Sequence, residues 1–268
     1  MRILVLGDVV GKPGRKVIRE NLLKVITNNK INFTVLNGEN AADDGKGITK
    51  SIAEELFESG VDVITSGNHI WDKKETSEFI EKEQRLLRPA NFFEGSPGKG
   101  YGIYFTKDKK HKVGVINLIG NVFMKKSEDV FQVAKEIKEK MRLKDNVDFI
   151  VVDFHGEITS EKMAIGHFFD GYSTGVVGTH THVPTADSRI LDKGTAYQTD
   201  IGMCGDYNSV IGMNKENSIM KFLKDEKAQN HFPAEGKSTL SGIIIEGDSS
   251  TGLAKKVKRF ISGGVLGL

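Results

Sequence analysis

The chain lacks both paired cysteines and long hydrophobic runs. Its one cysteine, Cys204, cannot form a disulfide within the chain, which fits a reducing compartment. No stretch reaches the roughly 18 consecutive apolar residues that a membrane-spanning helix needs. The apolar run at residues 3–6 ends at Gly7-Asp8 and is too short for the core of a signal peptide. We therefore expect a cytoplasmic protein without a membrane partner.

An excess of charge of one sign is also absent. Lys and Arg total 38 against 36 Asp and Glu, so nothing in the composition indicates a nucleic-acid partner. Any anionic ligand must then be held by local groups. Because 268 residues without a repeat or a low-complexity tract suit one large core, we expect a single domain over residues 1–268. The sequence leaves the number of subunits open, and a homo-oligomer is one alternative.

Two common catalytic motifs are not expected. Residues 7–12 resemble a phosphate-binding loop, but they have one residue too few between the glycines, and Pro13 takes the place of Ser or Thr. We also expect no serine-hydrolase nucleophile elbow.

Short apolar runs alternate with helical patterns along the chain. The runs end at Gly, Asn, Asp or His, and they predict buried strands over residues 2–6, 33–36, 61–65, 113–118, 149–154 and 175–177. Amphipathic patterns predict helices over residues 15–28 and 52–58, and this alternation implies a largely parallel sheet. Further strands at 195–199 and 242–246, with little helix between them, suggest a second sheet. We therefore expect an α/β fold in which a β-sandwich of two mixed sheets is flanked by helices, with loops over residues 92–102, 107–112 and 224–237.

Metal-ligand side chains follow the ends of the predicted strands, where α/β sheets bind ligands. A pair of divalent cations needs a shared carboxylate, with imidazoles or amides to complete each shell. Each residue alone has a plainer interpretation, such as a helix cap for Asp8 or a turn for Asn40, but such accidents at five strand ends are improbable together. The pair His180 and His182, one residue apart on an extended segment, would leave on the same face. The sequence therefore predicts a two-metal site among the strand-end residues Asp8, Glu39, Asn40, Asn68, His69, His155, His180 and His182.

In their order along the chain, these motifs resemble the calcineurin-like metallophosphoesterase superfamily, whose blocks run Asp-x-His, Gly-Asp, Gly-Asn-His, a lone His and Gly-His-x-His. The resemblance is closer to the YmdB-type branch and covers nearly the whole chain, because the first two blocks read Asp8-Val9-Val10 and Gly38-Glu39-Asn40. Also specific to that branch are Gly-Thr-His-Thr-His-Val-Pro-Thr-Ala-Asp at residues 178–187 and Thr-Asp-Ile-Gly-Met at residues 199–203. The resemblance implies a metallophosphoesterase-type β-sandwich.

The resemblance also implies two metal ions. It places Asp8, Glu39, Asn40 and His182 around one ion, and Glu39, Asn68, His155 and His180 around the other. Val10 stands where the superfamily usually has an imidazole ligand, and the amide oxygen of Asn40 is the natural substitute. Nitrogen and oxygen ligands without thiolate suit iron or manganese.

His69 remains outside this ligand set. By resemblance it approaches the scissile phosphate and acts as a general acid, a role that suits an imidazole near neutral pH. In many superfamily members an acidic residue follows this histidine and orients it, whereas here Ile70 follows. Asp72, a residue elsewhere or no residue at all would then orient His69.

The resemblance implies a dinuclear-metal phosphodiesterase in which a metal-bridging hydroxide attacks phosphorus, with cyclic nucleotides such as 2′,3′-cAMP as substrates. Two divalent cations, two carboxylates and one hydroxide sum to about +1, which favours a phosphodiester monoanion over a monoester dianion. The alternatives are a phosphomonoesterase or phosphoprotein phosphatase, and a non-catalytic nucleotide-sensing regulator on the same fold. Trp71 and Phe123 are candidates for stacking on a base, although a structural role is the plainer interpretation of each.

Overall fold

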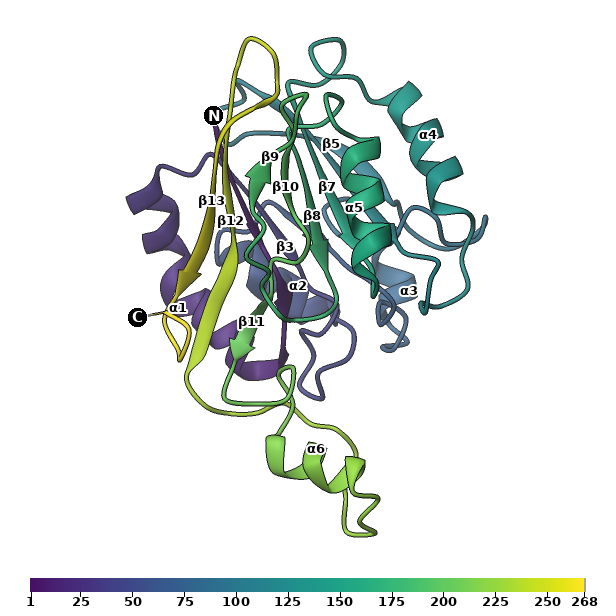
Figure 1. Cartoon of the computed structure of the whole chain (residues 1–268), viewed down its shortest axis with the longest axis vertical. Coiled ribbons are helices and arrows are strands. Elements are labelled where there is room, and N and C mark those ends of the chain that lie inside the picture. The colour runs from purple at the N-terminus through teal and green to yellow at the C-terminus, as the bar shows by residue number, and fades with distance from the viewer. Residues whose placement is uncertain (268) are drawn as a thin grey trace.

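Two mixed β-sheets pack face to face, with helices on both outer surfaces, in the computed structural model of the chain, which describes residues 1–267 (Figure 1). This arrangement confirms the expected α/β sandwich. The first sheet has the order β2-β11-β12-β1-β3-β4, with β13 paired to β12, and the second has the order β5-β6-β7-β8-β10-β9. The strands are β1 (Arg2–Leu6), β2 (Asp8–Val9), β3 (Phe33–Asn37), β4 (Val63–Thr65), β5 (Tyr101–Phe105), β6 (Lys112–Ile119), β7 (Phe149–His155), β8 (Gly175–Thr179), β9 (Arg189–Ile190), β10 (Ala196–Gln198), β11 (Met203–Asp206), β12 (Ser238–Gly247) and β13 (Ala254–Ser262).

The central strands of each sheet run parallel, so their carboxyl ends lie at one edge. In the first sheet β1 pairs parallel with β3, and β3 with β4, while β12 pairs antiparallel with β1. In the second sheet β6, β7, β8 and β10 are parallel neighbours, and β5 and β9 form antiparallel edges. The crossovers between parallel strands are the reason that helices cover the outer faces.

Apolar side chains fill three layers. One cluster lies between the sheets and joins Val35 of β3 to Val151 of β7. A second cluster lies between the first sheet and helices α1 and α2, and a third lies between the second sheet and helices α4 and α5. The helices are α1 (Gly11–Asn29), α2 (Lys50–Glu58), α3 (Thr76–Phe79), α4 (Val130–Lys140), α5 (Thr159–Phe168) and α6 (Lys215–Phe222). The number of domains stays a prediction.

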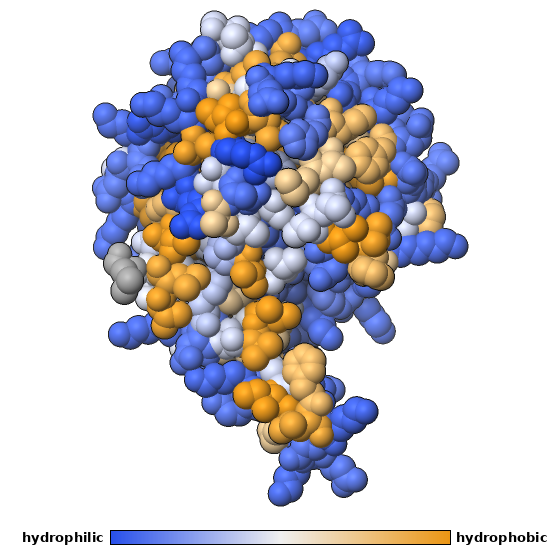
Figure 2. Space-filling view, viewed as in Figure 1, coloured by the Kyte–Doolittle hydropathy of each residue, from blue (hydrophilic) through white to orange (hydrophobic). Residues whose placement is uncertain are grey.

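Helix α6 projects from the sandwich with the loops on either side of it (Figure 1). Apolar side chains gather over this projection in the space-filling view (Figure 2), and Ile219, Phe222 and Leu223 are among its exposed residues. No helix within residues 1–267 is both long and apolar enough to cross a membrane.

The structure corrects several predicted elements. Helix α1 begins at Gly11, four residues before the predicted start, because Pro13 falls in its first turn, where the missing N–H costs no hydrogen bond. Helix α6 lies between the two late strands, where little helix was expected. Residues 107–111 do form the tip of the β5-β6 hairpin, and residues 224–237 contain no helix, but the predicted loop at 92–102 ends earlier because β5 begins at Tyr101.

Candidate metal centre

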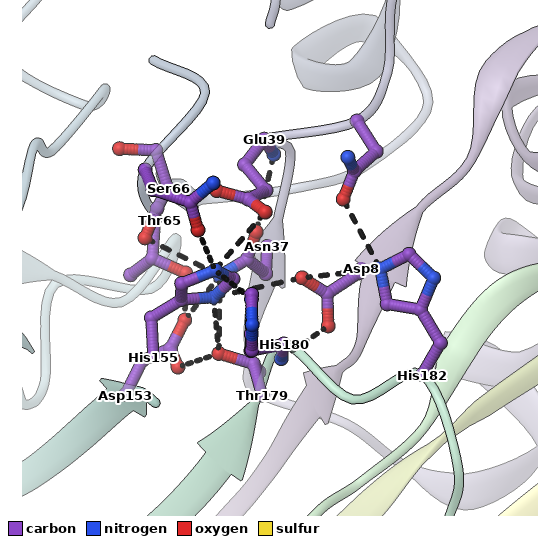
Figure 3. A network of polar contacts seen from close by, with 12 residues as sticks. Asp8, Asn37, Glu39, Thr65, Ser66, Asp153, His155, Thr179, His180 and His182 are labelled. Carbon is purple, nitrogen blue, oxygen red and sulfur yellow. Dashed lines mark hydrogen bonds and ion pairs between the residues drawn. The ribbon is translucent and has the colours of Figure 1, made fainter. Parts of the chain in front are cut away.

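Every candidate metal ligand lies at the carboxyl end of a parallel strand. Asp8 follows β1, Glu39 and Asn40 follow β3, and Asn68 follows β4 in the first sheet. In the second sheet, His155 is the last residue of β7, and two further histidines, His180 and His182, follow β8. Because the two sheets pack face to face, their strand ends meet, and the side chains converge on one buried region (Figure 3).

One group of ligand atoms surrounds the ring of His155. Its Nε2 lies 3.0 Å from Glu39 Oε1, 3.1 Å from Asn68 Oδ1 and 3.1 Å from His180 Nδ1. A single ring nitrogen carries at most one hydrogen, so it cannot make three hydrogen bonds at once. One atom each from Glu39, His155 and His180 lie within 4.8 Å of one another, as expected of ligands that share a cation.

A second group lies beside the first. His182 Nε2 is 3.2 Å from Asn40 Oδ1 and 3.9 Å from Asp8 Oδ1, and the same Asp8 oxygen lies 3.6 Å from His155 Nδ1. The carboxylate of Asp8 therefore lies between the two groups. The structure thus brings all seven candidate side chains together, in two neighbouring groups.

In each of the three histidines, one ring nitrogen faces the other candidate ligands. The second ring nitrogen, here called the outer nitrogen, forms a hydrogen bond or an ion pair with a group that is not a candidate ligand. His155 Nδ1 lies 3.0 Å from Thr179 Oγ1, and His182 Nδ1 donates to the carbonyl of Ile211 at 2.7 Å. His180 Nε2 lies 2.9 Å from a carboxylate oxygen of Glu157. Histidines that bind metals show this arrangement, because the outer partner fixes the tautomer and leaves the other nitrogen free to coordinate.

Two further observations fit a cation at this position. Oδ1 of Asp8 is buried and has no hydrogen-bond partner among the described residues, which is costly for a carboxylate unless a positive charge faces it. At Gly67, a Cβ atom would lie 2.2 Å from Glu39 Oε2 and 2.3 Å from His155 Nε2. Only glycine at this position lets the ligand atoms approach as closely as they do.

The electrostatics of the centre also favour positive charge. Burial alone would raise the pKa of Glu39, but His155 outweighs it and lowers that pKa to about 2. Burial would lower the pKa of His155, yet the carboxylates of Glu39 and Asp8 raise it to about 9. Burial and, as a smaller cause, the nearby His155 lower the pKa of His180 to about 3, so this ring is neutral and able to coordinate a metal. A metal cation would supply the positive charge in place of the His155 proton.

The prediction that His180 and His182 share one face of an extended segment is wrong. Strand β8 ends at Thr179, and both histidines have positive φ angles, 98° and 65°. The residue between them, Thr181, donates its backbone N–H and its hydroxyl to Asp200 Oδ2, at 3.1 and 2.8 Å. Asp200 in turn forms a buried ion pair with Lys162 at 2.7 Å. This anchor bends the segment, so each histidine enters a different group of ligands.

A buried hydrogen-bonded chain behind His155 was not predicted from the sequence. Thr179 Oγ1 donates to Asp153 Oδ1 at 2.7 Å and therefore accepts from His155 Nδ1. The other oxygen of Asp153 accepts from Thr65 Oγ1 at 2.5 Å and from Asn37 Nδ2 at 2.9 Å. The sequence does carry a signal for it, since Asp153 interrupts an apolar strand two residues before His155 and so leaves on the same face.

We expect Thr179→Val to weaken metal binding about 10- to 100-fold, as changes in the groups behind a metal-bound histidine do. Valine keeps the shape but removes the acceptor for His155 Nδ1–H and a donor to Asp153, whereas Thr179→Ser retains the hydroxyl. Titration with manganese against a competing chelator measures the effect. Equal affinities for the valine and serine variants would contradict this role of the hydroxyl.

His69 lies at the edge of the centre, with its side chain 26% exposed. Its backbone N–H donates to Glu39 Oε2 at 3.2 Å, and its Nδ1 is 2.8 Å from Asp72 Oδ2. Asp72 was one of the groups that the sequence suggested could orient His69. Because it contacts Nδ1, it leaves the Nε2 of His69 available for another partner. The nearby Lys125 lies 3.6 Å from Asp72 and donates to the backbone carbonyl of Asn68.

The prediction that the chain has no Gly-x-Ser-x-Gly motif of serine hydrolases is wrong for the sequence itself, because residues 171–175 read Gly-Tyr-Ser-Thr-Gly. A nucleophile elbow exposes its serine on a turn from strand to helix. Here the turn runs from α5 to β8, and Ser173 is fully buried with its hydroxyl bonded to the carbonyl of Phe169. Residues 171–175 therefore match the motif in sequence but form a structural turn without a nucleophile elbow.

Comparison with known proteins agrees with the motifs. A family model described as YmdB-like protein matches residues 4–260. A Bacillus subtilis (strain 168) protein named 2′,3′-cyclic-nucleotide 2′-phosphodiesterase is 49% identical over 261 residues, which cover 97% of each chain. A crystal structure of a hypothetical protein from Thermus thermophilus has a TM-score of 0.89 and 34% identity, covering 98% of this chain and 100% of that one. A structure titled as a novel phosphatase from Mycoplasma pneumoniae has the same TM-score and 37% identity, covering 98% and 93%. The chain therefore belongs to the YmdB-like protein family.

Proposed function

We propose that this chain is a phosphodiesterase that hydrolyses 2′,3′-cyclic nucleotides at a centre of two metal ions, iron or manganese. The observation that carries the proposal is the convergence of seven oxygen- and nitrogen-bearing side chains from five strand ends, with the outer nitrogen of each histidine ligand already occupied. The name of the Bacillus subtilis relative supports the substrate class. The cytoplasmic location and the oligomeric state remain predictions.

The metal ions would be held in two sets that share Glu39. Asn40 and His182, with Asp8, face one side, and Asn68, His155 and His180 face the other. When bound, divalent cations at this position supply positive charge to the phosphoryl oxygens and acidify water near neutral pH. The carboxylates and imidazoles of the chain hold that charge in a buried region, where electrostatic interactions are strong.

His69 is the group that we assign to proton transfer. Asp72 accepts from Nδ1–H and orients the ring, so Nε2 is left to give a proton to an oxygen that leaves phosphorus. In a 2′,3′-cyclic nucleotide, water adds to phosphorus, the bond from phosphorus to O2′ breaks, and O2′ receives the proton. The product is a nucleoside 3′-monophosphate, which matches the 2′-phosphodiesterase name of the relative.

Hydrolysis by the manganese-loaded protein tests the proposal. We expect turnover of 2′,3′-cAMP to 3′-AMP, and of bis-p-nitrophenyl phosphate, with slower turnover of the monoester p-nitrophenyl phosphate. Faster turnover of the monoester would indicate a phosphomonoesterase instead. Binding of metal and nucleotide without any hydrolysis would indicate a non-catalytic nucleotide-sensing regulator.

A further inference from the structure

Phe123 combines two unfavourable features. Its side chain is 85% exposed, and its backbone lies in the left-handed region with φ at 59°. The left-handed region is strained for a residue with a Cβ atom, and an exposed aromatic ring gains little from packing. The structural role expected from the sequence is therefore wrong for this residue. Strained residues of this kind cluster at binding sites, where the strain presents a side chain in a particular direction.

The loop that carries Phe123 starts and ends on the candidate metal centre. At its start, the N–H of Gly120 donates to the backbone carbonyl of His155 at 2.9 Å. At its end, Lys125 donates to the backbone carbonyl of Asn68. Phe123 is three residues from Gly120, so at most about 11 Å of chain separates it from that contact. The backbone of Phe123 therefore lies within about 11 Å of Gly120, which itself contacts the backbone of His155.

The base of this loop is fixed by several hydrogen bonds, most of them part-buried. The backbone N–H groups of Asn121 and Val122 donate to the two carboxylate oxygens of Glu161, at 2.8 and 3.4 Å. The side chain of Asn121 also donates to the carbonyl of Glu128 at 2.9 Å and accepts from the N–H of Val130 at 2.9 Å. The chain thus holds an exposed aromatic residue on a rigid stem, which reduces the entropy lost when a ligand binds to it.

The other aromatic candidate from the sequence is already packed. The ring of Trp71 lies 6.3 Å from that of Phe92, and Trp71 packs against the core cluster beneath α1 and α2. This agrees with the structural role expected for Trp71. Of the two aromatic candidates from the sequence, only Phe123 has a free face.

We propose that Phe123 is a specificity-determining residue on which the nucleobase of the substrate stacks while its phosphate lies at the metal centre. This inference rests on the proposed function and extends it, because it assigns the part of the site that distinguishes a nucleotide from a simple phosphodiester. Every base has a π face, so stacking would accept several bases and favour the larger purines.

The test compares Phe123→Ala with Phe222→Ala in the manganese-loaded protein. Phe222 is a matched control, since it is 83% exposed but lies on the projecting helix α6. We expect Phe123→Ala to raise KM for 2′,3′-cAMP about 5- to 100-fold with a small change in kcat, as loss of base stacking predicts. Phe123→Trp should restore the KM. For a cyclic phosphate of methyl riboside, which has no base, Phe123→Ala should leave KM unchanged.

Other results would overturn the inference. An unchanged KM for 2′,3′-cAMP in Phe123→Ala would exclude stacking while leaving the proposed function intact. Equal losses with the nucleotide and the base-free substrate would show that Phe123 supports only the loop. If the wild type hydrolyses no cyclic nucleotide, the proposed function fails. Equilibrium binding of 3′-AMP then decides the inference, which survives only if Phe123→Ala weakens it and Phe222→Ala does not.

Discussion

His69→Ala is expected to lower kcat for 2′,3′-cAMP about 10²- to 10⁴-fold, the usual contribution of a general acid, while metal content stays unchanged. The geometry explains both the loss of activity and the retention of metal. The side chain of His69 contacts Asp72 rather than the ligand groups, and only its backbone N–H reaches Glu39, so alanine leaves that hydrogen bond in place. Steady-state kinetics and elemental analysis of the purified variant measure the two quantities.

His111→Ala is the matched control. Its side chain is also part-exposed, at 30%, and its Nδ1 also faces a carboxylate, that of Asp148, at 3.9 Å. It lies on the β5-β6 hairpin, away from the centre, so this variant should keep wild-type kcat and metal content. Full activity of His69→Ala would remove His69 from the mechanism. Loss of metal from the same variant would show that its ring is a ligand instead.

Glu39→Ala is expected to have a larger effect on metal binding than any change behind the ligands, and therefore to exceed the 10- to 100-fold expected of Thr179→Val. Glu39 is the one carboxylate that we assign to both ions, and its removal leaves His155 without the negative charge at 3.0 Å. Both ions should be lost, and hydrolysis with them. Elemental analysis after dialysis against a fixed manganese concentration measures this.

A variant at an exposed acidic residue controls for general loss of charge. Glu157 contacts His180 Nε2 at 2.9 Å and is 49% exposed, so Glu157→Gln should weaken binding much less than Glu39→Ala. The Glu39 variant must also be shown to fold, by its circular dichroism spectrum. A folded Glu39→Ala protein that retains both metal ions would contradict the assignment of this carboxylate.

The fold and the convergence of the candidate ligands were predictable because they depend on local patterns. Apolar runs that end in Gly, Asn, Asp or His mark buried strands, and parallel strands bring their carboxyl ends to one edge. Strand β13 was not predicted, because exposed charged residues on both of its faces hide the alternating apolar pattern of a strand, at Lys255, Lys256, Lys258 and Arg259.

The conformation of the centre depends on distant contacts and could not be predicted. His180 and His182 diverge because Asp200, which follows β10, binds the threonine between them, and Lys162 of α5 holds Asp200 in place. The loop that carries Phe123 likewise depends on a distant residue, because Glu161 of α5 accepts from the backbone N–H groups of Asn121 and Val122. A sequence pattern names the residue types that can bind a metal, whereas long-range packing decides which atoms face one another.

Anomalous diffraction from crystals of the manganese-loaded protein tests the central claim most directly. We predict two manganese peaks roughly 3.5 to 4 Å apart. One peak should lie beside His155 and His180 and the other beside His182, with Glu39 between them. No peak at His155 under saturating manganese, or a peak coordinated only by surface carboxylates elsewhere, would contradict the account.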